Sequence, residues 1–202
     1  AYEGLGSIYW HMVSKLLLAV QETYFRAARA GESAATLRAL HDTYYDIRQG
    51  LGFNKSPDVY GAFPTDPYSH TPAGQGAKQP GMTGMVKEEI LTRWGELGVG
   101  VVEGKLVFDV ALLRESEFLA QATDFAYVDV TGAARAISLA AGSLAYTFCQ
   151  VPIVYVTGGE TRIDVCDAGG QIRQILGLTL DAETSAHIFR RDGAVQQVTV
   201  HL

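Results

Sequence analysis

The chain has 202 residues, of which 48% are hydrophobic and 19% charged, so it can bury a sizeable core and lies outside the range of disordered chains. Its 22 acidic and 16 basic residues give a formal charge of −6, which argues against a nucleic acid or an anionic membrane as partner, because both require a basic face. A neutral ligand such as a sugar remains compatible with this balance.

The first fifty residues predict two helices. Ser7 is suited to cap a helix over 8–30, whose apolar residues surround most of the cylinder, so we expect neighbours on most sides. Gly31 ends this helix, and Ser33 caps a second one over 34–49. The short link between the two helices predicts an antiparallel hairpin.

Neither a membrane span nor a signal peptide is expected in this chain. The most apolar run, 8–20, is too short and too often interrupted to cross a bilayer, and it lacks the charged start and the cleavage site of a signal peptide. We therefore expect a soluble chain, and its compartment is unknown from the sequence.

Residues 50–82 form the most unusual segment, because they hold five of the six prolines together with several glycines and aromatic residues. Disordered linkers are poor in aromatic residues, so we expect an ordered, irregular loop lying over a surface. Thr83 then caps a third helix over 84–97. Its apolar face is expected to comprise Val86, Ile90, Trp94 and Leu97.

After Gly98 the hydrophobic pattern changes from helical to alternating, which indicates strands. A hairpin is predicted at Glu103-Gly104, and a short helix over 182–189. Pro152 predicts a break or bulge in the longest strand. Further strands are expected over 125–130, 136–139, 144–157, 161–166, 172–178 and 194–202.

The predicted fold class is therefore α+β. Residues 1–98 form a helical segment that includes the loop 50–82, and residues 99–202 form an antiparallel β-sandwich. Cys149 and Cys166 are too few for a disulfide framework and are expected as free, buried thiols. No dense spacing of His and Cys occurs, so neither a metal nor a cofactor is predicted.

Several segments together carry a resemblance to a known class of enzymes. The helix start 7–17, the proline–glycine loop and a helix leading into an all-β tail resemble the C-terminal end of glycoside hydrolases and phosphorylases built on an (α/α) toroid. The stretch 144–156, followed by Ile163, 188–189 and 198–202, is similar to the β-sandwich that closes such enzymes. The resemblance implies that the bulk of the toroid, with at least one catalytic carboxylate, lies outside these residues.

Sugar recognition requires apolar ring faces together with carboxylates, amides and imidazoles that bind hydroxyl groups. The loop supplies this mixture, and a toroid would present the start of the first helix to its cleft. The loop aromatics could equally pin the loop to the helices, with the start of the first helix packed in a core. The candidate carbohydrate-binding residues are Trp10, His11, Asn54, Tyr60, Phe63, Asp66, Tyr68 and His70.

A complete catalytic pair is not visible. Glycoside cleavage requires two carboxyl groups at a defined separation, whereas the adjacent Glu88 and Glu89 diverge by about 100° around a helix. We expect both on a solvent-exposed face, with Glu89 placed to meet Arg93 one turn later. The catalytic residues are therefore unknown.

Two other functions are compatible with the sequence. The chain could be a self-associating structural or interaction module, a homo-oligomer in which a second copy covers the apolar first helix. It could also be a small complete enzyme that uses Asp58, Asp66 and His70. The leading prediction remains the C-terminal part of a carbohydrate-active protein that takes a neutral saccharide and lacks its N-terminal helical domain.

Overall fold

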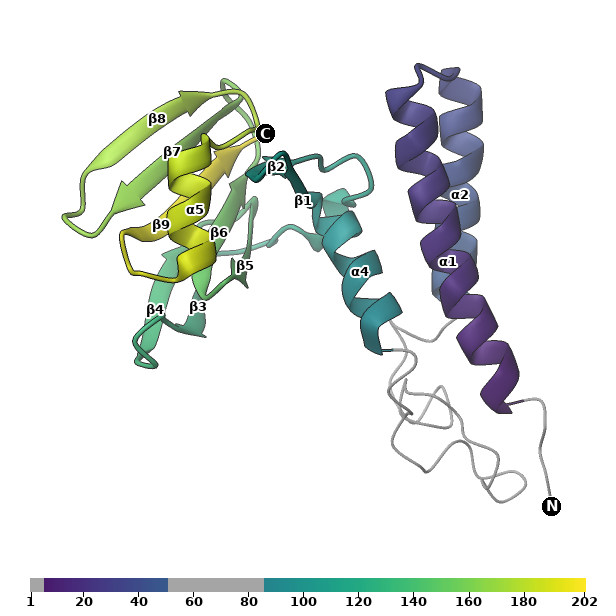
Figure 1. The fold of residues 1–202 in the computed structure, drawn as a ribbon, viewed down its shortest axis with the longest axis horizontal. Helices are drawn as coiled ribbons and strands as arrows, with labels where there is room; N and C mark the ends of the chain where they lie inside the picture. Colours follow the sequence, from purple (N-terminus) through teal and green to yellow (C-terminus); the bar gives the residue numbers. More distant parts are fainter. Residues whose placement is uncertain (1–5, 51–85) are drawn as a thin grey trace. The chain divides into compact units, whose positions relative to one another are not determined.

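The computed structural model describes residues 6–50 and 86–202, with side chains from Met12 to Gly50 and from Glu88 onward. The chain divides into two compact units, Ala1–Gly95 and Glu96–Leu202. We call them the helical unit and the β unit and describe each by itself (Figure 1).

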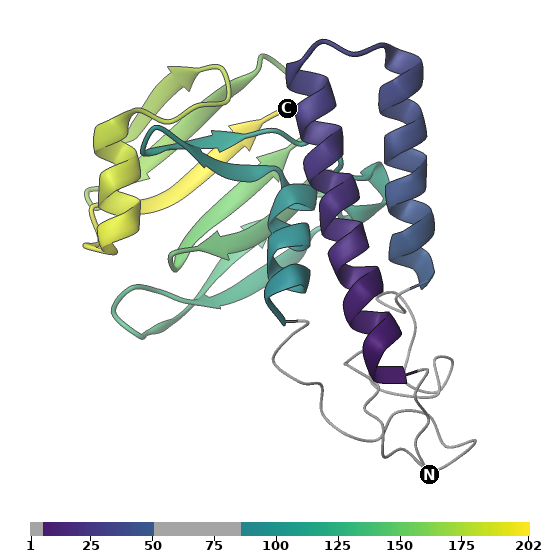
Figure 2. The same ribbon diagram turned by 45° about the vertical axis from the view of Figure 1, so that its right-hand side comes forward.

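Two antiparallel helices form the predicted hairpin in the helical unit. They are α1 (Gly6–Arg29) and α2 (Ala34–Gly50), which run side by side in Figures 1 and 2. Ser33 caps α2 as predicted, because its Oγ accepts a 3.1 Å hydrogen bond from the backbone amide of Thr36. Leu17 of α1 and Tyr44 of α2, both fully buried, form the centre of the apolar contact.

The third described helix, α4 (Val86–Leu97), is turned opposite to the expected orientation. Ile90 and Trp94, predicted on its packed face, are 46% and 44% exposed, whereas Glu88 and Thr92 are buried. Thr92 tolerates burial because its hydroxyl donates a 2.8 Å hydrogen bond to the carbonyl oxygen of Glu88. The polar stripe of α4 therefore faces inward, which corrects the predicted solvent exposure of Glu88.

The β unit opens with two short hairpins. Strands β1 (Val99–Val102) and β2 (Lys105–Phe108) are joined at Glu103 and Gly104, whose φ values of 49° and 75° lie in the left-handed region that tight hairpin turns require. This confirms the turn predicted there. A 3₁₀ turn, η1 (Glu115–Glu117), precedes the second hairpin of β3 (Thr123–Val128) and β4 (Ala134–Leu139).

A five-stranded sheet forms the centre of the β unit. Its spatial order is β5-β6-β9-β7-β8, and every neighbouring pair is antiparallel except β6 with β9, which is parallel. The helices and antiparallel strands confirm the α+β class. The strands are β5 (Ser143–Phe148), β6 (Val151–Val156), β7 (Arg162–Asp167), β8 (Ile172–Leu176) and β9 (Val195–His201), with helix α5 (Ala182–Arg190) between β8 and β9.

The long strand expected over 144–157 is two strands, and Pro152 does not separate them. The chain turns instead at Cys149 and Gln150, both with positive φ, which carry none of the usual sequence signals of a turn. Pro152 lies within β6 opposite Thr147, while the pairing of β6 with β9 begins one residue later. Its missing N–H therefore removes no hydrogen bond from the sheet.

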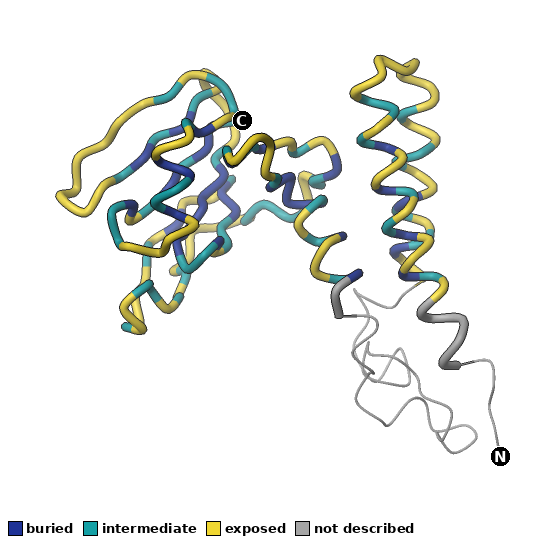
Figure 3. The backbone as a smooth tube through the Cα atoms, in the orientation of Figure 1, coloured by how far each residue is buried: buried dark blue, intermediate teal, exposed yellow. Residues whose placement is uncertain are grey.

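One apolar core lies between the five-stranded sheet and the β1–β2 hairpin, with α5 against the same layer. Phe108 of β2 meets Tyr155 of β6 edge to face, with ring centroids 6.0 Å apart. Figure 3 shows buried residues concentrated in these elements. The fully buried core residues include Leu106, Ile153, Tyr155, Ile163, Ile188, Val198 and Val200.

Candidate functional site

The predicted sugar-binding residues fall outside what the structure describes. Trp10 and His11 belong to α1, but their side chains are outside the described set. The loop residues Asn54, Tyr60, Phe63, Asp66, Tyr68 and His70 are outside it altogether. All eight therefore stay predictions.

Within the described part of the helical unit, the most unusual feature is a set of buried polar side chains that connects three helices. We call this set the polar seam and define it as Gln21 of α1, Tyr44 of α2, and Glu88 and Thr92 of α4. Each member is at most 4% exposed. Buried polar groups carry a desolvation cost, so a seam of this kind must be hydrogen-bonded or serve another purpose.

Gln21 is the central member of the polar seam. Its amide nitrogen donates to the carbonyl oxygen of Thr92 at 2.8 Å and to the hydroxyl of Tyr44 at 3.3 Å, so one side chain joins all three helices. The glycine at position 95 permits this approach, because a Cβ there would lie 2.2 Å from the Gln21 Oε1 atom. The close packing of α1 on α4 therefore depends on a glycine and a glutamine together.

Glu88 is the member whose hydrogen bonding is incomplete. The residue is 4% exposed, and its Oε2 atom accepts no hydrogen bond. A buried acceptor left without a donor costs about 1–3 kcal/mol and calls for an explanation. Carboxyl groups with this kind of burial are frequent among catalytic and ligand-binding residues. Glu88 is therefore the best-supported candidate functional residue among the described side chains.

Sequence reasoning missed the polar seam because it followed the apolar residues of α4. A second stripe was present in the same helix, since Glu88, Thr92 and Gly95 lie on successive turns. Gln21 in an otherwise apolar helix was the matching signal on α1. A polar stripe opposite a buried glutamine could have indicated a polar helix interface.

In the β unit, a cavity of about 710 Å³ lies between α5 and the β7–β8 hairpin. Arg173 and Asp181 on its wall form an ion pair of 2.8 Å, and the backbone amide of Thr184 donates to Asp181 at 2.7 Å. Burial alone would raise the pKa of Asp181, but these hydrogen bonds outweigh burial and lower the pKa to about 2. The two charges thus attach the start of α5 to β8.

Two histidines of the β unit form pairs with carboxylates. His187 lies 2.8 Å from Asp192, and His201 lies 2.9 Å from Asp164. Each carboxylate also binds an arginine, so both groups act as local ion pairs. Hydrogen bonding to His187 is the main reason why the pKa of Asp192 falls to about 2. Across residues 6–50 and 86–202 no three His, Cys, Asp or Glu side chains gather in a way that could hold a metal ion.

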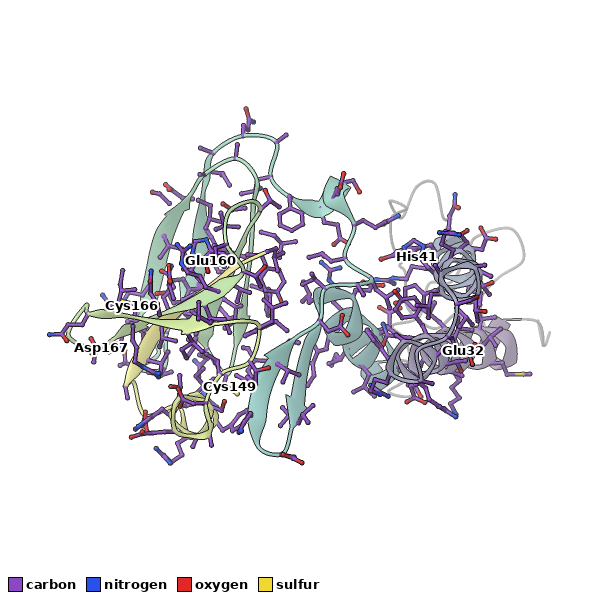
Figure 4. The ribbon with its side chains drawn as sticks, turned by 90° about the horizontal axis from the view of Figure 1, so that it is seen from above. Glu32, His41, Cys149, Glu160, Cys166 and Asp167 are labelled. Carbon is purple, nitrogen blue, oxygen red and sulfur yellow. The ribbon has the colours of Figure 1, made fainter. Side chains whose placement is uncertain are left out.

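The two cysteines are free and half-buried. Figure 4 shows them well apart within the β unit, with Cys149 beside α5. Burial raises the pKa of the Cys149 thiol, an effect that the nearby Arg191 only partly offsets. The thiol is therefore protonated at neutral pH and a poor nucleophile.

No protein-family model matches the chain, and no curated protein is significantly similar to it. None of the described helices is long and apolar enough to pass through a bilayer. The functional argument therefore depends on the geometry of the polar seam and on the exposed faces of the helices around it.

Proposed function

We propose that the chain is the C-terminal part of a glycoside hydrolase-like enzyme built on an (α/α) toroid. The helical unit borders the saccharide cleft, and the β unit supports the helices. The observation that carries the proposal is the orientation of α4, with Glu88 buried and Trp94 44% exposed. A helix of this kind needs further helices over its apolar side, as each helix in a toroid has neighbours on both flanks.

Glu88 is the chemical component of this proposal. Its free oxygen can accept a hydrogen bond from a sugar hydroxyl, and a carboxyl group removed from water suits a general acid. Glycoside cleavage also needs a second carboxyl group about 5–10 Å away, and we assign that group to the remainder of the toroid. The chain by itself is then expected to bind a saccharide without turning it over.

A fluorescence titration tests the saccharide-binding part. The chain has two tryptophans, and Trp94 lies on the same helix as Glu88, so a bound sugar should change the emission. We expect a saturable change with one class of neutral oligosaccharide. Glu88→Gln should weaken that binding about tenfold, which corresponds to one charge-assisted hydrogen bond.

Glu89→Gln is the matched control, because it makes the same chemical change one position along the same helix. It should bind like the unsubstituted chain. A flat response of folded protein across the whole panel would overturn the proposal of sugar binding. Equal weakening in both variants would remove Glu88 from the site.

A self-associating module remains the second candidate function, and the exposed apolar side of α1 favours it. Met12 and Leu16 are 59% and 51% exposed although they belong to the most apolar helix. In this function a second copy covers them. Leu16→Glu should then reduce the mass in solution by half while the helix content stays unchanged. Leu17→Glu is unsuitable, because Leu17 is 1% exposed and the substitution would unfold the hairpin.

A further inference from the structure

Strand β8 forms an open edge of the five-stranded sheet. Its pairing partner among the described residues is β7, and its other side faces outward in Figures 1 and 2. Natural edge strands are commonly protected by proline, lysine or a bulge. None of these occurs within Ile172–Leu176, and the irregularity nearby lies in the pairing of β7 with β9 at Cys166 and Asp167.

The backbone of β8 offers hydrogen-bonding groups at every second residue. Two bonds fix the phase of the β7–β8 pairing, from the amide of Asp167 to the carbonyl of Gln171 and from the amide of Gly177 to the carbonyl of Thr161. In an antiparallel pair the residues alternate in direction, so the odd-numbered residues of β8 bond to β7. The amides and carbonyls of Ile172, Gln174 and Leu176 therefore point to the open edge.

The side chains of the same three residues share one face of the sheet, because strand side chains alternate with a period of two. Ile172 is 66% exposed and Leu176 is 76% exposed, and both lie at equal distance along the strand from Gln174. They are the two most exposed large apolar residues of the described chain. The edge is thus symmetric about Gln174 in both its backbone and its side chains.

We propose that two copies of the chain pair antiparallel through β8, around a two-fold axis at Gln174, and join their five-stranded sheets into one. In this register Ile172 of each copy lies opposite Leu176 of the other, and the outward amides and carbonyls bond to each other. A shift by one residue puts outward groups opposite inward ones. A shift by two leaves Ile172 opposite Gln174.

The observations favour a second copy over an unrelated strand because a single register satisfies the backbone and the apolar pair at once. Such a self-complementary patch is what a two-fold interface requires. Arg173, on the other face, remains bound to Asp181 and Thr184 and introduces no unpaired charge. The inference is independent of the proposed function and of the exposed residues on α1.

Charge substitutions at the axis test this pairing in the full chain. Gln174→Lys places two lysines opposite each other in the dimer, and Gln174→Glu places two glutamates there. Like charges directly opposite destabilise a strand pair, so each variant should associate about tenfold more weakly than the unsubstituted chain in sedimentation equilibrium. An equimolar mixture of the two variants should recover the dimer, because opposite charges then meet.

The same pair of charges at Thr147, an exposed residue of the other edge strand β5, is the matched control and should not change the mass. Circular dichroism verifies that each variant is folded. A monomeric unsubstituted chain at all accessible concentrations would overturn the proposal, and so would dimers that survive both Gln174 variants. A dimer lost in Leu16→Glu but kept in Gln174→Lys would assign the contact to α1 and equally overturn it.

Discussion

The hydroxyl group of Tyr155, at the centre of the sheet, donates a 2.5 Å hydrogen bond to the carbonyl oxygen of Leu97, the last residue of α4. Helix ends leave carbonyl groups without partners inside the helix, and this one is satisfied by a fully buried phenol. Tyr146 lies 2.8 Å from the same hydroxyl, so two phenols and one carbonyl form a short buried network. Removal of the central hydroxyl should therefore affect both contacts.

Tyr155→Phe is expected to lower the free energy of unfolding of the β unit by about 1–3 kcal/mol, because the Leu97 carbonyl loses a buried donor. Urea denaturation followed by circular dichroism measures the change. Tyr146→Phe keeps the bond from Tyr155 to Leu97 and should cost less. Equal costs in the two variants would show that the helix end finds another donor.

Asp181→Ala should lower the free energy of unfolding by about 0.5–2 kcal/mol at neutral pH, the usual range for loss of an N-cap. The contribution depends on pH, because the pKa of Asp181 falls from 3.8 to about 2 on folding. It is present in full above pH 3.8 and is lost as the pH falls toward 2. Urea denaturation of both proteins at neutral and acidic pH should show the difference between them shrink.

Glu183→Gln is the control for this acid dependence, since Glu183 lies on the same turn of α5 but outside the Asp181–Thr184–Arg173 hydrogen bonds. Its stability should follow that of the unsubstituted chain at each pH. A difference between Asp181→Ala and the parent that stays constant down to pH 2 would contradict the assigned pKa.

Glu88→Met should raise the free energy of unfolding of the helical unit by about 1 kcal/mol, because an apolar side chain of similar length replaces a buried carboxyl group with an unsatisfied oxygen. Thermal unfolding followed by helix content measures the gain. Thr92→Val is a useful comparison, because the Thr92 hydroxyl has acceptors in Glu88 and Glu89 and its loss should not stabilise. A destabilised Glu88→Met would mean that the carboxylate supports the fold.

Gly98→Ala should destabilise the β unit by several kcal/mol. Gly98 has a φ of 73°, and a Cβ at this position would lie 2.2 Å from the backbone oxygen of Asp109. Gly104→Ala is matched in backbone conformation at φ 75° but meets no atom within 4 Å, so it should cost only about 1–2 kcal/mol of backbone strain. Chemical denaturation of the pair separates strain from collision, and similar losses would contradict the collision.

Sequence reasoning located most elements because their signals are local. The cap at Ser33, the turn at Glu103 and the helix end at Gly98 depend on the chemistry of one or two residues each, and the structure places all three as expected. The turn at Cys149 and Gln150 was missed, because neither residue favours positive φ. Its conformation is held by distant groups, since the Gln150 side chain bonds to the carbonyl of Asp129 and to Arg191.

The candidate site was less accessible than the fold. Sequence periodicity placed Trp94 and Ile90 on the packed side of α4, because apolar residues usually face a core. The choice was instead set by Gln21 and Gly95, a contact between residues far apart in the sequence. Pairings of this kind leave no periodic signal, and the parallel contact of β6 with β9 escaped prediction for the same reason.

The position of β9 has a consequence for the order of events during folding. It is the last of the five strands to be synthesised, yet it lies in the middle of the sheet between β6 and β7. The β5–β6 and β7–β8 hairpins can each form early, since their strands are neighbours in sequence, but they cannot join until β9 arrives. On the ribosome the two hairpins therefore wait as separate pieces with one apolar side uncovered, and the β unit closes in a single late step.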